Sequence, residues 1–179
     1  MLKIIAIADY ALVGHLEPDA DIDLLLSLGD LYDVTIEKAV DVYAPEHVFA
    51  VRGNHCVDTL FTAPTVDLHL QRLECLGLSL GGFAGSWRYK SHGNHMYTQE
   101  QEHALLTDFP AVDIFIAHNS PHGIHERDSH NHQGFDAFLD YIDRAQPSYF
   151  FHGHQHCNQI SYRGKTCVVG VYGERLISI

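Results

Sequence analysis

Short, unbroken runs of apolar residues recur along the chain and end at polar residues or glycine. The first three runs cover Leu2–Ala8, Ile22–Leu28 and Val48–Val51. Their length and composition are typical of strands that are buried on both faces. The segment Val34–Tyr43 has helical periodicity and lies between the second and third runs. This alternation of strand and helix predicts an α/β domain.

After Thr59 the pattern changes to apolar pieces separated by glycines, which favours hairpin-linked strands. Strands are expected at Leu68–Leu70, Leu73–Phe83, Val112–Ala117, Ser148–Phe151, Lys165–Val171 and Arg175–Ile179. A helix over Gln99–Thr107 should be capped by Thr98, with Gln101 completing a capping box. A second helix over Gly134–Ala145 should place Phe135, Phe138, Leu139 and Ile142 on one side. The polar segment Asn119–Gln133 is expected to be a loop, and residues 1–179 to form a single domain.

Composition narrows the class of protein. The chain has 179 residues, 46% of them hydrophobic and 19% charged, and no apolar run is long enough to span a bilayer. The apolar residues 1–8 resemble a short signal sequence, but Asp9 follows them without a cleavage site, so we expect a cytoplasmic protein. The net charge of -12 disfavours binding to long duplex nucleic acid, because phosphate backbones are repelled. No membrane partner is expected, and the oligomeric state is left open.

Histidine is the most unusual part of the composition. There are 15 histidines, and eight of them lie between His118 and His156. Histidine is a common metal ligand and acid–base group. The four cysteines form no Cys-x-x-Cys pair, which favours free thiols in a reducing compartment. The histidines, rather than the cysteines, therefore carry the candidate chemistry.

Several predicted strands end directly at residues that can bind metal. These residues are Asp9, Asp30, Asn54, His118, His154 and His156. Sites in open α/β sheets form at the carboxyl ends of strands, so we expect these side chains to converge. Carboxylate, amide oxygen and imidazole ligands suit Mn, Fe, Zn or Ni. Asp9 and Asp30 could instead be helix N-caps, a common use of aspartate after a strand.

The order Asp … Gly-Asp … Gly-Asn-His … His … Gly-His-x-His, from Asp9 to His156, resembles the calcineurin-like metallophosphoesterases. The resemblance implies a four-layer αββα sandwich, in which two mixed sheets are flanked by helices. It also implies a phosphoesterase centre with two divalent cations, of which manganese is the favoured metal. Two cations roughly 3.5–4 Å apart can share a bridging hydroxide and clamp the phosphoryl oxygens.

The resemblance also implies a role for each residue. Asp30 would bridge the two cations, Asp9 and His156 would hold the first, and Asn54, His118 and His154 would hold the second. His55 would protonate the leaving oxygen. His55 could alternatively be a hydrogen-bonded loop residue without a chemical role.

One motif departs from the family pattern. The family usually has a histidine two residues after its first aspartate, whereas this chain has Asp9-Tyr10-Ala11. Ala11 cannot bind a metal, so the first cation should be held weakly or be recruited with substrate. His15 is a nearby imidazole that could take its place through a loop.

Three residues are candidates for contacting substrate: Arg88, Asn54 and His132. Arg88 could instead be a surface ion-pair residue. We therefore expect a metal-dependent phosphoesterase that acts on a small phosphorylated molecule or a short nucleotide, with phosphodiesters favoured over phosphomonoesters. The alternatives are a degenerate relative that binds one metal or a phosphorylated ligand without turnover, and a non-enzymatic scaffold.

Overall fold

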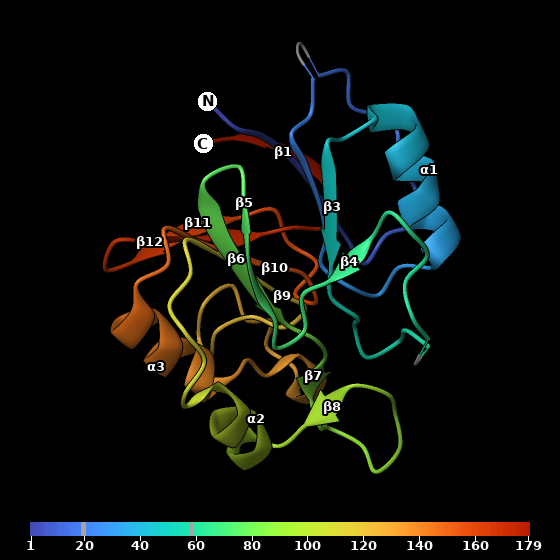
Figure 1. Ribbon diagram of the computed structural model, residues 1–179. Coiled ribbons are helices and arrows are strands. Elements are labelled where there is room, and N and C mark those ends of the chain that lie inside the picture. Colours follow the sequence, from blue (N-terminus) through green and yellow to red (C-terminus); the bar gives the residue numbers. More distant parts are fainter. Residues whose placement is uncertain (19–20, 58) are drawn as a thin grey trace.

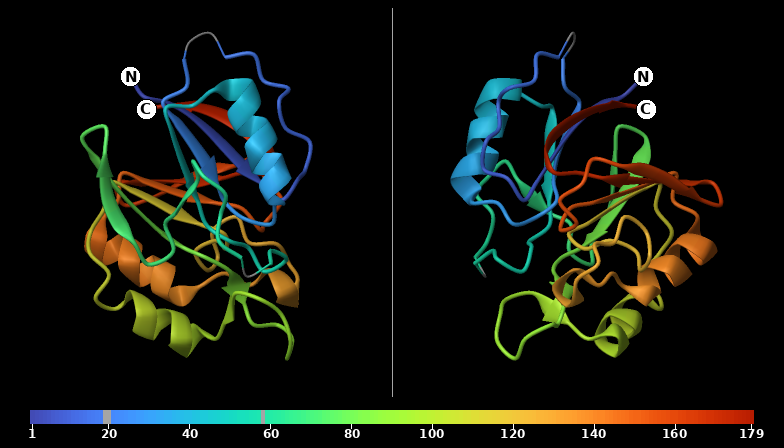
Figure 2. Two further views of the ribbon diagram at one scale, coloured as in Figure 1. Left: turned by 45° about the vertical axis from the view of Figure 1, so that its right-hand side comes forward. Right: turned by 180° about the vertical axis from the view of Figure 1, so that it is seen from behind.

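Two large mixed β-sheets pack face to face at the centre of the molecule (Figures 1 and 2). The structure is a computed structural model that describes residues 1–18, 21–57 and 59–179. The first sheet has the order β13–β1–β2–β3–β4, with bounds Gly173–Ser178, Lys3–Ala8, Leu24–Ser27, His47–Ala50 and Val66–Asp67. The second has the order β11–β12–β10–β9–β6–β5, with bounds Ile160–Arg163, Thr166–Gly170, Tyr149–His152, Ile114–Ala117, Leu78–Phe83 and Arg72–Cys75. A small third sheet pairs β7 (Ser86–Trp87) with β8 (Met96–Tyr97).

The helices lie on the outer faces of the two sheets. Helix α1 (Asp33–Tyr43) covers the first sheet, whereas α2 (Gln99–Leu106) and α3 (Asp136–Ala145) lie against the second (Figures 1 and 2). A 3₁₀ turn, η1, spans His130–His132. Among the described residues, no helix combines the length and apolar character needed to cross a bilayer.

Strand β1 shows how the apolar runs create this arrangement. Ile4, Ala6 and Ala8 contribute to the core between the two sheets, and Ile5 and Ile7 to the core under α1. Both faces of the strand are therefore buried, as an unbroken apolar run requires. A third core, rich in phenylalanine, joins the second sheet to α2 and α3. The predicted α/β class with two mixed sheets is confirmed.

Most of the predicted elements are present, with shifts at their ends. Thr98 caps α2 through a complete capping box with Gln101, as expected. Three details of the prediction are wrong. The strand expected at Leu68–Leu70 does not form: β4 ends at Asp67, and His69 makes only an isolated bridge to Gly82. Strands β7, β8 and β11 were not expected, because they are short. Helix α3 buries Ala137 and Tyr141, whereas Leu139 is only half-buried.

The strand directions bring the predicted site residues to one edge of the structure. β1, β2 and β3 are mutually parallel neighbours in the first sheet, and β6, β9 and β10 are parallel neighbours in the second. Since parallel strands end on the same side of a sheet, the polar residues that follow them converge.

Glu174 of β13 fixes the segment that follows Asp9. Its carboxylate accepts hydrogen bonds from the backbone N–H groups of Gly14 and His15, each at 2.8 Å, and from the hydroxyl of Tyr43 at 2.6 Å. β13 itself pairs antiparallel with the whole of β1. The last strand therefore holds both the first strand and the loop that leaves it.

Glu102 is a carboxylate buried between α2 and α3. Its side chain is fully buried, and within the described part of the chain neither carboxyl oxygen has a hydrogen bond of normal geometry. Burial raises the pKa of Glu102 to about 9, with a partly opposing contribution from the backbone N–H of Ala137 and further raising by Asp136 and Asp140. Glu102 is therefore protonated in the folded protein at neutral pH.

This burial predicts a pH-dependent stability. The folded state keeps the Glu102 proton that the unfolded chain loses near pH 4.5, so the stabilisation is complete below that pH and is lost as the pH rises towards 9. Glu102→Gln, which is neutral at every pH, should raise the free energy of unfolding at pH 8 by about 2 kcal/mol. Thermal unfolding from pH 5 to 9 would test this, with the exposed Glu37→Gln as control. Equal pH slopes for wild type and Glu102→Gln would contradict it.

Candidate metal centre

The predicted ligands follow strands from both sheets. Asp9 follows β1, Asp30 follows β2, and Asn54 with His55 follows β3. His118 follows β9, and His154 and His156 follow β10. Four of these residues have positive φ: Asp9 (60°), Asp30 (54°), His154 (61°) and His156 (47°). Such conformations in non-glycine residues cost free energy and are concentrated at functional sites, so the backbone here is held by its surroundings.

Glycines allow the backbone segments of the site to approach one another. A Cβ on Gly53 would collide with the carboxylate of Asp30. A Cβ on Gly153 would lie 2.8 Å from Oδ2 of Asp9. Gly29 adopts φ +95°, and its Cβ would lie 2.7 Å from Nδ1 of His118. At Gly29, Gly53 and Gly153 there is thus no room for a larger side chain. At Gly29 the positive φ is a second reason for glycine.

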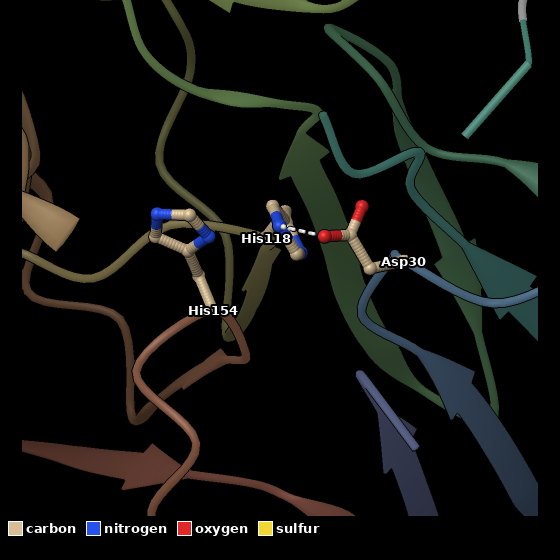
Figure 3. A group of neighbouring side chains, drawn as sticks. All are labelled: Asp30, His118 and His154. Atoms are coloured by element: carbon tan, nitrogen blue, oxygen red, sulfur yellow. Dashed lines mark ion pairs between the residues drawn. The ribbon is translucent and has the colours of Figure 1, made fainter. Parts of the chain in front are cut away.

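Asp30, His118 and His154 form the tightest group of candidate ligands (Figure 3). One ligand atom from each lies within 4.8 Å of the others. Nε2 of His118 lies 3.3 Å from Oδ2 of Asp30 and 3.2 Å from Oδ1 of Asn54. These four side chains, which are predicted to hold the second cation, are brought together by the fold.

Backbone carbonyls orient the two imidazoles of this group. Nδ1 of His118 donates to the carbonyl of Leu28 at 2.8 Å, and Nε2 of His154 donates to the carbonyl of Asn131 at 3.0 Å. A carbonyl only accepts, so Nε2 of His118 and Nδ1 of His154 are left to face a cation. Outer hydrogen bonds of this kind are typical of metal-binding histidines.

Charge inside the group is balanced by an ion pair. Burial favours neutral forms, but His118 outweighs burial and holds the pKa of Asp30 well below its usual range. The carboxylates of Asp30 and Asp9 likewise overcome burial and raise the pKa of His118 to about 10. A cation that binds here would displace the proton from Nε2 of His118, since a metal ligand must be deprotonated.

Asp9 and His156 define the predicted first position. The Asp9 side chain is 1% exposed, and its Oδ1 has no hydrogen-bond partner among the described residues. Its Oδ2 accepts from the backbone N–H of His154 at 2.8 Å. Oδ1 lies 3.9 Å from Nε2 of His156. Burial raises the pKa of Asp9 to about 7, while the charge of His118 opposes the rise and Asp30 adds to it.

The donor sets of the two positions differ in how well they fit a divalent cation. The second position has four donors, and its two histidines are oriented by carbonyls. The first has only the carboxylates of Asp9 and Asp30 and the imidazole of His156, because Ala11 offers no ligand. His15, which could have replaced that ligand, does not line the cavity that opens over Asp30 and His154.

A cavity of about 370 Å³ opens over the group. It is lined by the predicted site residues Asp9, Asp30, His55, His132, His154 and His156, together with Tyr89, Arg127 and Asn131. Asn54 and His118 are buried beside these residues rather than at the surface. His55 is exposed, and its backbone N–H donates to Oδ1 of Asp30 at 2.7 Å. The fold therefore brings the proposed proton donor to the rim of the metal group.

Arg88 is the one predicted site residue that the fold places elsewhere. It is exposed, does not line the cavity, and its guanidinium donates to the carbonyl of Met96 at 2.8 and 3.2 Å. This contact ties the end of β7 to β8.

Three cavity residues were not anticipated from the sequence. Tyr89 accepts a hydrogen bond from Nδ2 of Asn54 through its hydroxyl at 3.3 Å. Arg127 and Asn131 come from the long loop 119–133. Arg127 could have been suspected as one of only 11 basic residues, in a loop rich in histidine. For Asn131 no signal was available.

Comparisons with known proteins agree with this geometry. The sequence matches the family described as the calcineurin-like phosphoesterase superfamily domain over residues 6–172. No curated protein matches it significantly.

Solved structures share the fold at low sequence identity. A phosphopantetheinyl hydrolase, PptH, from Mycobacterium tuberculosis is 12% identical, with a TM-score of 0.61 over 96% of this chain and 89% of its own. The protein TT1561 of Thermus thermophilus is 16% identical, with a TM-score of 0.59 over the same shares. A mutant of Vps29 from Entamoeba histolytica is 12% identical, with a TM-score of 0.51 over 96% and 74%. The family match over residues 6–172 includes every candidate ligand from Asp9 to His156. This protein therefore belongs to the calcineurin-like phosphoesterase superfamily.

Proposed function

We propose that this protein is a metal-dependent phosphoesterase. One observation carries the proposal: Asp30, His118 and His154 converge from three strands of two sheets, beneath a cavity that His55 also lines. A divalent cation held there would polarise a phosphoryl oxygen and lower the pKa of a bound water. Manganese is the favoured metal, with iron, zinc or nickel as alternatives. The proposed set has two cation positions, of which the one beside Asp9 and His156 is weak.

The chain's own residues would position the ester and supply the proton. Asn54 is fixed by Tyr89 and His118, so its amide is oriented before substrate arrives. His132 lies over His154 with ring centroids 5.0 Å apart, at the wall of the cavity. His55 would donate a proton to the leaving oxygen, since it lines the cavity and is not one of the proposed metal ligands.

The substrate we propose is small and phosphorylated, and a phosphodiester is favoured over a phosphomonoester. The cavity of about 370 Å³ suits a single phosphoester group with a compact substituent. The net charge of -12 argues against a long duplex. A cytoplasmic location is part of the same proposal.

Hydrolysis of bis-p-nitrophenyl phosphate by chelator-stripped protein, titrated with manganese, tests the proposal. We expect saturable activity that needs added metal. Hydrolysis of p-nitrophenyl phosphate in parallel would separate diesterase from monoesterase activity. Absence of metal-dependent hydrolysis of either ester would contradict the proposal.

The role of His55 can be tested through the leaving group. His55→Asn should lower the rate roughly 100-fold or more for a dialkyl phosphate such as dimethyl phosphate, whose leaving group is a poor one, an alkoxide. The loss should be much smaller when p-nitrophenolate leaves, because that group needs little protonation. The exposed His103→Asn, outside the site, is the matched control. Equal losses for both leaving groups would remove His55 as the acid.

A second candidate is a binding protein that holds one cation or a phosphorylated ligand without turnover. Ala11 favours it, because the first position lacks an imidazole. The fold is compatible with it, since the fold is shared with a protein named as a hydrolase and also with one named for vacuolar protein sorting. This candidate predicts an inactive wild type that binds one metal, and activity in Ala11→His.

A further inference from the structure

Among the residues that the structure describes, Arg127 is the only arginine or lysine that lines the cavity. Its Nη1 lies 3.3 Å from Nδ1 of His156 and 3.3 Å from Nε2 of His132. A guanidinium has donors and no acceptor, so both ring nitrogens must accept. The hydrogen bonds of Arg127 therefore fix the protonation pattern of two histidines at the site.

For His156 this pattern opposes metal binding. An imidazolium carries a proton on both ring nitrogens, so a His156 ring whose Nδ1 accepts a hydrogen bond is neutral. Because Nδ1 accepts from Arg127, the single proton lies on Nε2, the nitrogen that faces Oδ1 of Asp9. Neither nitrogen then has a free lone pair. A cation between Asp9 and His156 would require the proton to move to Nδ1, where it would meet the N–H of Arg127.

The second position shows the reverse arrangement. There the carbonyls of Leu28 and Asn131 hold the protons of His118 and His154 away from the metal group. Hydrogen bonding thus favours a cation at one position and disfavours it at the other. The absence of an imidazole at Ala11 acts in the same direction.

Arg127 is also held in a defined place. Its backbone N–H donates to Oε1 of Gln155 at 3.0 Å, and Gln155 is 1% exposed. Nε2 of Gln155 donates to the carbonyl of His132 at 2.7 Å and to Oγ of Ser120 at 2.9 Å. Gln155 stands between the two histidines of the Gly-His-x-His segment, so it ties the loop that carries Arg127 to the metal group.

The rest of the Arg127 guanidinium is available to a ligand. Over residues 1–18, 21–57 and 59–179, its side chain makes only two hydrogen bonds, with His132 and His156. Nε and Nη2 remain, and the planar fork of arginine matches two oxygens of a phosphate.

We propose that the protein holds one resident divalent cation, on Asp30, Asn54, His118 and His154, and that Arg127 binds the phosphoryl oxygens on the side of Asp9 and His156. The second positive charge that an anionic substrate meets is then an arginine of this chain. This inference rests on the proposed function for the identity of the anion.

Metal stoichiometry gives the first test. Calorimetric titration of chelator-stripped wild type with manganese should show one tight site. The double variant Ala11→His with Arg127→Met should show two, because a ligand is gained and His156 is released. Two tight sites in the wild type, or one in the double variant, would overturn the first half of the proposal.

Binding of inorganic phosphate to the manganese-loaded protein gives the second test. Arg127→Met should weaken phosphate binding at least tenfold and leave the affinity for the resident manganese at Asp30, His118 and His154 unchanged, and Arg127→Lys should recover part of the loss. Arg163→Met, which removes a surface ion pair with Asp143, is the matched control. Unchanged phosphate affinity in Arg127→Met, or no phosphate binding by the wild type, would overturn the second half.

These outcomes are separable from those of the proposed function. Ester hydrolysis that is unaffected by Arg127→Met would leave a phosphoesterase without this role for Arg127. An inactive wild type that binds one manganese, and binds phosphate through Arg127, would leave the inference standing without the hydrolytic function.

Discussion

Asp30→Asn is expected to abolish tight manganese binding and to lower metal-dependent ester hydrolysis by more than roughly 100-fold. Loss of a direct ligand should exceed the roughly 10- to 100-fold effect of losing an outer-sphere partner. The amide keeps an oxygen that can accept from the backbone N–H of His55, so the local fold should survive. It loses the charge that pairs with His118 at 3.3 Å. Among the predicted ligands, Asp30 alone is assigned to both cation positions.

Calorimetry with manganese and the ester assay would measure both effects in the same preparation. Asp143→Asn is the matched control, because it alters an exposed aspartate on α3. Thermal unfolding would show that Asp30→Asn is folded. Wild-type manganese affinity in Asp30→Asn would mean that the metal group described above does not hold the cation.

Asp33→Asn is expected to produce the largest loss of stability, about 3 kcal/mol in the free energy of unfolding. Asp33 of α1 pairs with Arg52, whose side chain is only 4% exposed. Nη1 of Arg52 donates to Oδ1 of Asp33 at 2.6 Å, and Cζ lies 3.6 Å from the ring centroid of Phe61. Removing the carboxylate charge would leave a buried guanidinium without its counter-ion.

A double-mutant cycle would separate the ion pair from general damage to α1. Asp33→Asn with Arg52→Met should be more stable than Asp33→Asn alone, because no buried charge is then left unpaired. Asp41→Asn, an exposed aspartate of the same helix, should be close to wild type in urea unfolding. A double variant less stable than either single variant would refute this account of the pair.

Motifs that follow strands were predictable from the sequence because their positions are fixed locally. An apolar run that ends at Asp9 or at Gly29-Asp30 determines both the strand and the place of its polar end. The strand directions then bring such ends together. For the same reason Asp30, His118 and His154 could be grouped although 124 positions, from 30 to 154, separate the first from the last.

Residues of the loop 119–133 could not be placed in the same way. This segment has no periodicity, and its course is set by distant contacts such as that between Arg127 and Gln155. Arg88 was assigned to the site because it is a scarce cation in a glycine-rich stretch, but the β7–β8 pairing directs it to Met96. Arg127 has the position in the cavity that was expected for Arg88.

The contacts of Glu174 have a consequence for the order in which the site is completed during synthesis. β13 emerges from the ribosome after every other described strand, yet it carries the carboxylate that holds Gly14, His15 and Tyr43. Until then β1 lacks one of its two neighbours, and the loop beyond Asp9 has no anchor. The group around Asp30, His118 and His154 can assemble earlier, since its strands precede β13. A nascent chain should therefore gain its cation-binding group before the Asp9 side of the cavity takes its final form.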